Sequence, residues 1–320
     1  MIDDFNFRPE LFHDSAIENE MRTLTASVNQ KLRDAPARWE MSLEVERSLP
    51  PGNGTFSLAR SDLPLNAEDF HINGPGGQIR IRRIVPSTGA PTVVYLHFHG
   101  GGFYLGSAGG QDCMLNELAH DANAIVLSVE YRLAPEHPYP AAVADAEAAA
   151  FWLVGNSSSV FGLDRIVLGG ESAGAYLSLS AALRLRDRHG FTALAGLNLF
   201  QGAFDLRGTP SICLSDNEFV GRRAFETNMK RFVGERRNSP EVSPLFHSLH
   251  DLPPALISLG TADACMDDSL FLYMRWLTYA RQAVLHVYPG AFHGFLLFDC
   301  RLARIAKQKV AEFVRNAGVK

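Results

Sequence analysis

Residues 165–180 constrain the fold of this chain more than any other stretch. They read RIVLGGESAGAYLSLS: an apolar run typical of a strand, two glycines, and a small-residue run typical of a helix. Within them, residues 170–174 (GESAG) match the pattern G-x-S-x-G, which predicts Ser172 on a sharp strand-to-helix turn. Five residues can match by chance, so an ordinary Gly/Ser turn remains the alternative until the rest of the chain is considered.

A second glycine-rich motif lies upstream. Residues 92–98 (TVVYLHF) form a continuous apolar run, as expected for a strand buried on both faces, and they lead into His99-Gly100-Gly101-Gly102. Consecutive glycines cost chain entropy, so they indicate backbone amides that must approach something closely. Such a loop upstream of G-x-S-x-G is typical of an oxyanion hole, to which the Ala173 N–H at the helix start would contribute.

An acid and a base follow downstream of the serine. Asp263 comes just after the predicted strand 255–260, and His293 comes after the predicted strand 283–288. Parallel sheets place their chemistry at the carboxyl ends of strands, so both side chains are expected at the serine's edge. Asp267 and Asp268 are interpreted instead as N-cap or first-turn acids of a helix over 269–280.

Three motifs in this order identify a family. HGGGF (99–103), EYRLAPEHPYPAA (130–142) and GESAG resemble the hormone-sensitive lipase family of α/β-hydrolases, the bacterial family IV esterases. The resemblance covers roughly residue 92 to the C-terminus, and Glu171 stands where many members have Asp. It implies an α/β-hydrolase fold: a mostly parallel central sheet, helices on both faces and a helical cap. Arg132, Glu136 and His137 in the middle motif are interpreted as structural.

The resemblance also implies boundaries and residue roles. We expect an N-terminal helical part of the cap at 1–50, core at 51–204, a cap segment at 205–247 and core at 248–320. The expected site residues are catalytic Ser172, Asp263 and His293, oxyanion donors among Gly100, Gly101, Gly102 and Ala173, and substrate-binding Phe103, Glu171 and Phe204. Gly101 and Gly102 are the favoured loop donors, with Gly100 left open.

The predicted function is that of a serine carboxylesterase acting on small to medium acyl esters through an acyl-enzyme. The chemistry requires no metal and no organic cofactor. An amide, formamide or lactone hydrolase with the same triad is the alternative. A non-catalytic ligand-binding protein on a hydrolase fold is a third hypothesis, disfavoured because serine, aspartate and histidine are all present.

Composition narrows the partners. A net charge of −5 disfavours nucleic acid and anionic membranes, and no apolar stretch of the sequence approaches the length of a membrane span. The acidic N-terminus lacks a signal-peptide pattern, and the four cysteines form no C-x-x-C pair, so free thiols and a cytoplasmic location are expected. An amphipathic helical pattern within residues 1–50 suggests a cap, a homodimer contact or a plain surface helix. Its apolar positions include Phe5, Phe7, Ile17, Met21, Leu24, Val28 and Leu32.

Overall fold

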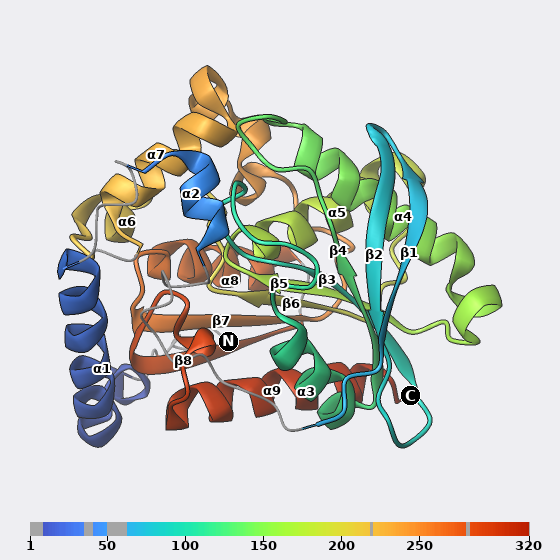
Figure 1. The fold of residues 1–320 in the computed structure, drawn as a ribbon, viewed down its shortest axis with the longest axis horizontal. Coiled ribbons are helices and arrows are strands. Elements are labelled where there is room, and N and C mark those ends of the chain that lie inside the picture. The colour runs from blue at the N-terminus through green and yellow to red at the C-terminus, as the bar shows by residue number, and fades with distance from the viewer. Residues whose placement is uncertain (1–8, 35–40, 50–62, 218–219, 280–281, 320) are drawn as a thin grey trace, which may run out of the picture.

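A single mixed sheet organises the chain. The computed structural model describes residues 9–34, 41–49, 63–217, 220–279 and 282–319, which form an eight-stranded sheet in the order β1-β2-β4-β3-β5-β6-β7-β8 (Figure 1). Strand β2 runs antiparallel to β1 and β4, and the other neighbours are parallel. The strands are β1 Ala67–Gly74, β2 Gly77–Ile84, β3 Val93–Phe98, β4 Ala124–Val129, β5 Ile166–Glu171, β6 Gly196–Phe200, β7 Ala255–Ala262 and β8 Ala283–Phe292.

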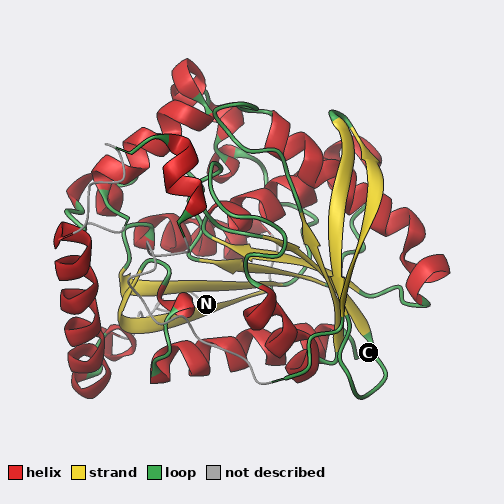
Figure 2. Cartoon of the chain, viewed as in Figure 1, coloured by secondary structure: helices red, strands yellow, loops and turns green. Residues whose placement is uncertain are grey.

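Helices cover both faces of this sheet (Figure 2). The helices are α1 Ser15–Asp34, α2 Leu43–Ser48, α3 Asp112–Ala122, α4 Ala141–Phe161, α5 Ala173–His189, α6 Pro210–Leu214, α7 Arg222–Phe232, α8 Met266–Tyr279 and α9 Arg301–Ala317. On one face α4 and α5 pack together over the sheet with α8 against β7, while α3 and α9 pack on the other. The predicted mostly parallel sheet with helices on both faces is therefore confirmed.

The central strands are apolar because neither of their faces meets solvent. Every residue of β3 and β4 is buried, as the continuous apolar run in residues 92–98 predicted. Strand β2 instead alternates, with Ile79 and Ile81 buried and Arg80 between them only partly buried, as suits its place near the sheet edge. The sequence pattern and the burial of each strand therefore agree with its position in the sheet.

The N-terminal segment is divided between two places. Helix α1 has the predicted amphipathic face, with Met21 and Val28 buried, but it packs against β8, where Gly290 approaches Met21. Helix α2 lies instead beside α7 in the upper part of Figure 1, over the carboxyl ends of the strands. Phe5 and Phe7, two of the apolar positions named from the sequence, lie outside the described residues.

Residues 205–247 lie between β6 and β7 and add no strand to the sheet within the described residues. They contain α6, α7 and three short 3-10 turns at Gly234–Asn238, Pro240–Val242 and Pro244–Phe246. Phe225 and Phe232 of this segment are buried, as is Phe204 just before it, whereas Phe246 is exposed and Phe219 lies outside the described residues. Across the described ranges, none of the helices has the length and apolar character that crossing a membrane would require.

Candidate active site

Ser172 occupies the turn between β5 and α5. Strand β5 ends at Glu171 and α5 begins at Ala173, so the serine is the single residue that reverses the chain. Its backbone has φ 56° and ψ −117°, a region that residues with a Cβ rarely adopt. Such strain persists only where the surroundings enforce it, and it projects the hydroxyl out of the sheet edge.

The flanking glycines allow this turn to approach β3. A Cβ on Gly174 would lie 1.8 Å from the Phe98 carbonyl oxygen, and one on Gly170 would lie 2.1 Å from the same atom. Both distances are far inside van der Waals contact with backbone that cannot move aside. The G-x-S-x-G spacing therefore reflects close packing of the turn against the end of β3.

Three loops bring the predicted serine, histidine and aspartate together. His293 follows β8 and Asp263 follows β7, so both leave the sheet at the edge where Ser172 stands. His293 Nε2 lies 2.8 Å from Ser172 Oγ, and His293 Nδ1 lies 2.7 Å from Asp263 Oδ1. The histidine and aspartate side chains are 6% and 0% exposed, so water does not compete for the bond between them.

The electrostatics favour protonation of His293. Burial lowers the pKa of its imidazole, but the Asp263 carboxylate opposes this and raises it, so that the net pKa of His293 lies above its ordinary value. The Cys265 backbone N–H donates to the same Asp263 oxygen at 2.8 Å, which orients the carboxylate toward the ring. Asp263 therefore holds the proton on Nδ1 and leaves Nε2 free to accept one from Ser172.

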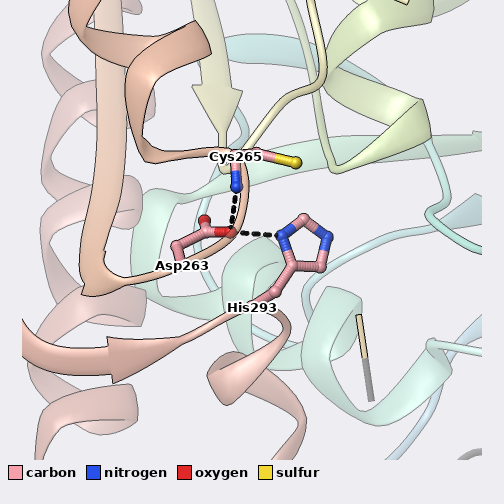
Figure 3. A group of neighbouring side chains, drawn as sticks. All are labelled: Asp263, Cys265 and His293. Atoms are coloured by element: carbon pink, nitrogen blue, oxygen red, sulfur yellow. Dashed lines mark hydrogen bonds and ion pairs between the residues drawn. The ribbon is translucent and has the colours of Figure 1, made fainter. Parts of the chain in front are cut away.

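Asp263, Cys265 and His293 also form a set of potential metal ligands (Figure 3). One ligand atom from each lies within 4.8 Å of the others, and carboxylate, thiolate and imidazole all suit zinc. However, the Asp263 oxygen and the His293 nitrogen already share a hydrogen bond, and the Cys265 backbone N–H donates to the same oxygen. Hydrogen bonding accounts for this arrangement, and a metal would have to break it.

The oxyanion loop follows β3 directly beside Ser172. Gly101 has φ +116° and Gly102 has φ +60°, conformations that favour glycine. Within the described residues the structure gives no acceptor to the N–H of Gly101, Gly102 or Ala173. The Gly100 N–H differs, because it donates to Glu171 Oε1 at 2.7 Å. The Gly100 N–H is therefore already engaged by a carboxyl oxygen, whereas those of Gly101 and Gly102 are not.

The three predicted substrate-binding residues are all buried or nearly so. Phe103 is 1% exposed and stacks on Phe232 of α7 with ring centroids 3.8 Å apart. Phe204 is fully buried, and its N–H donates to Asp268 at 2.6 Å. Glu171 accepts the Gly100 N–H of the oxyanion loop.

Asp268 makes more contacts than a first-turn acid of a helix would. It does lie in the first turn of α8, as predicted, but it is fully buried and accepts the N–H groups of Phe204 and Asp205 and the Thr209 hydroxyl. It thereby ties the loop after β6 to α8. Burial raises the pKa of Asp268 to about 7. Its neighbour Asp267 likewise accepts the Ser211 N–H.

A buried carboxylate in α2 was missed. Glu46 is 4% exposed, accepts the Tyr104 hydroxyl at 2.6 Å and pairs with Arg231 of α7. It joins the N-terminal segment, the oxyanion loop and α7 at one point. The signal in the sequence was weak, because a glutamate in a short helix is usually exposed.

The middle motif is structural, as expected. Arg132 pairs with buried Asp145, and Glu136 pairs with Arg47 of α2. The two residues are therefore ion-paired, although not with each other. Two further histidines, His97 and His99, are buried at the sheet. Burial lowers the pKa of His97 to about 4 and also lowers that of His99, so both rings remain neutral near pH 7.

Comparison with known proteins agrees with this geometry. A family profile described as alpha/beta hydrolase fold matches residues 95–297. The carboxylic ester hydrolase LipN of Mycobacterium tuberculosis is 36% identical over 246 residues, which are 73% of this chain and 65% of LipN. The esterase LipI of the same organism is 35% identical over 64% of this chain and 67% of its own length. The matched part thus spans about two thirds of these relatives.

Solved structures cover nearly the whole chain. A hyperthermophilic esterase from Pyrobaculum calidifontis is 30% identical, with a TM-score of 0.79 over 96% of this chain and 99% of that one. The carboxylesterase EstE1, cloned from a metagenomic library, is 26% identical, with a TM-score of 0.74 over 94% and 98%. With its motifs and relatives taken together, the chain belongs to the alpha/beta hydrolase fold family and, within it, to the hormone-sensitive lipase group.

Proposed function

We propose that this chain is a serine carboxylesterase that hydrolyses small to medium acyl esters through an acyl-enzyme intermediate. The observation that carries the proposal is the continuous line of hydrogen bonds from Ser172 through His293 to Asp263, at 2.8 and 2.7 Å. A hydroxyl that is hydrogen-bonded to an imidazole, with the imidazole oriented by a buried carboxylate, is the arrangement that activates a serine nucleophile.

The reaction follows from these positions. His293 Nε2 accepts the Ser172 proton as Oγ attacks the ester carbonyl, and Asp263 stabilises the imidazolium that forms. The N–H groups of Gly101, Gly102 and Ala173 stabilise the oxyanion. His293 then gives its proton to the leaving alcohol, which leaves the acyl group on Ser172. Water activated by the same imidazole hydrolyses this acyl-enzyme and restores the serine.

Cap helix α7 supports the limit on acyl size. A Cβ on Gly102 would lie 2.5 Å from the Asn228 side chain of α7, so this helix lies directly over the oxyanion loop. Phe103 and Phe232 fill the space beside it with stacked rings. We expect activity on p-nitrophenyl esters to fall steeply beyond medium acyl chains, and a series that peaks at palmitate would contradict this.

The proposal includes the organisation and setting of the protein. Residues 1–50 and 205–247 would form the cap, with α2 and α7 as its contacts on the oxyanion loop. A cytoplasmic location is supported by four cysteines that are free thiols in the structure. The proposal also includes a homodimer, as the amphipathic pattern within residues 1–50 suggested.

Substitution of the nucleophile tests the proposal. Ser172→Ala is expected to lower the hydrolysis of p-nitrophenyl acetate by about 10⁴-fold or more, because the covalent route is lost while folding is retained. Hydrolysis by this variant at the parental rate would refute the mechanism. Comparing kcat/KM on matched ester, amide and lactone substrates then separates an esterase from the other hydrolases that use the same triad.

A further inference from the structure

The carboxyl group of Glu171 lies behind the oxyanion loop rather than in front of the nucleophile. Its Oε1 accepts the Gly100 N–H at 2.7 Å and the Gln111 side-chain amide at 2.5 Å. A Cβ on Gly100 would lie 3.1 Å from this oxygen, so the glycine permits the close approach. Glu171, the residue before the nucleophile, thus accepts a hydrogen bond from Gly100, the residue before the two oxyanion donors. The two residues are 71 positions apart in the sequence.

We propose that Glu171 is a positioning residue for ester hydrolysis: its carboxylate holds the Gly100 N–H and thereby orients the Gly101 and Gly102 N–H groups toward Ser172. The inference rests on the function proposed above, and it gives Glu171 a role different from the substrate contact expected from sequence. Because Glu171 and Ser172 are adjacent, this one hydrogen bond couples the nucleophile turn to the oxyanion loop. An oxyanion donor is useful only when it points where the charge will develop.

The surroundings of Glu171 allow it to act as a carboxylate. Gln111 is held by His97 Nε2 at 2.9 Å, so its amide donates toward Glu171. A cavity of about 40 Å³ adjoins Glu171, His97 and Asn198. This volume suffices for at least one hydrogen-bonded water at the carboxyl group. Burial raises the pKa of Glu171 to about 7, so its charge is sensitive to pH near neutrality.

Several titratable groups face Glu171 and bear on this pH dependence. Burial lowers the pKa of His97 and His99, so neither compensates its charge near neutral pH. The charge of Glu171 in turn helps to raise the pKa of His293. The groups that face Glu171 are Tyr95 and His97 on β3, His99 after it, Tyr131 after β4, His293 after β8, and, around the cavity, Glu117, Asp121 and Lys307.

Two substitutions of Glu171 distinguish its role as a hydrogen-bond acceptor from the effect of its negative charge. Glu171→Met removes the acceptor for the Gly100 N–H, and we expect kcat for p-nitrophenyl acetate to fall about 10–100-fold with KM little changed, which is less than the loss of a whole oxyanion donor. Glu171→Gln keeps an oxygen acceptor, so most of kcat should return. Because the negative charge is gone, the acid limb of its kcat/KM profile should also move toward lower pH.

The control is Glu117→Gln, the same loss of charge at another residue that lines the cavity, which pairs with Lys307 and not with the oxyanion loop. It should change neither kcat nor the acid limb. Rates are expressed per reactive Ser172, titrated with a fluorophosphonate, so that misfolded protein does not count. Parental kcat in Glu171→Met, equal loss in the Met and Gln variants, or an unmoved acid limb in Glu171→Gln would each overturn the inference. An inactive wild-type protein would instead refute the proposed esterase function.

Discussion

The strand ends and the helices that cover them position their residues in different ways. At the strand ends, Ser172, Asp263 and His293 each stand within one residue of a strand terminus, so the backbone hydrogen bonds of the sheet set their places. The cover is joined to the oxyanion loop by side chains, through the Phe103–Phe232 stack and the Glu46–Tyr104 hydrogen bond. The backbone of the sheet therefore positions the strand-end residues, whereas contacts between side chains position the helices that cover them.

The sharpest test of the strand-end side is Asp263→Asn. The amide cannot stabilise the imidazolium and favours the wrong tautomer of His293, so kcat should fall about 10³–10⁴-fold. Steady-state kinetics on p-nitrophenyl acetate measures this. Asp267→Asn is the matched control, because Asp267 contacts the Ser211 N–H of the cover rather than His293, and it should retain kcat within about threefold. Equal losses in the two variants would contradict the assignment of the acid.

A pair of glycines tests whether close backbone packing fixes the serine. Gly174→Ala places a Cβ 1.8 Å from the Phe98 carbonyl, so the free energy of unfolding should fall by about 3 kcal/mol or more. Gly155→Ala, within α4, meets nothing within 4 Å and should raise it by about 0.5–1 kcal/mol. Denaturant unfolding measures both values. A stable and active Gly174→Ala protein would show that the turn is not tightly packed.

Substitutions in the helices that cover the strand ends should have a smaller effect, and should change KM rather than kcat. Tyr104→Phe removes the hydroxyl that Glu46 accepts at 2.6 Å, which should cost about 1–3 kcal/mol of stability because a buried carboxylate loses a donor. We expect KM to rise while kcat stays within about threefold, since the substitution does not touch the strand ends. A fall in kcat with unchanged KM would place this contact in the chemistry instead.

The smallest expected effect is a displacement of the pH profile. His293 acts as a base only when neutral, and Asp263 raises its pKa above the ordinary value of 6.5 despite the opposing effect of burial. The acid limb of kcat/KM should therefore have its midpoint above pH 6.5. In Asp263→Asn the residual activity should show a midpoint at lower pH. An unmoved midpoint would mean that another group controls this limb.

The same division explains what the sequence could predict. The strands, the turn at Ser172 and the positions of Asp263 and His293 are local patterns of apolar runs and glycines, and the structure places them at one sheet edge. The engagement of Gly100 by Glu171 was not predictable, because it joins residues 71 positions apart through one side chain. The amphipathic pattern of α1 predicted a buried face but not that β8 would cover it.

The observed ends of one helix and one strand also differ from the predicted ends, for physical reasons. Helix α8 begins at Met266 rather than near 269, because the loop after β7 is only three residues long and Asp263 already starts the turn. Strand β8 continues beyond the predicted Tyr288 to Phe292, through Pro289 and Gly290, and so carries His293 to the end of the sheet. Propensity alone ends a strand at a proline and a glycine, but tertiary pairing with β7 extends it.

Covalent labelling of the intact protein by a fluorophosphonate probe tests the central claim most directly. The account predicts one label per chain, located by peptide mass spectrometry on Ser172, and labelling slowed by orders of magnitude in His293→Ala. A label on another residue would contradict the account, as would undiminished labelling of Ser172 without His293, because either result would mean that the hydrogen-bonded line does not activate this serine.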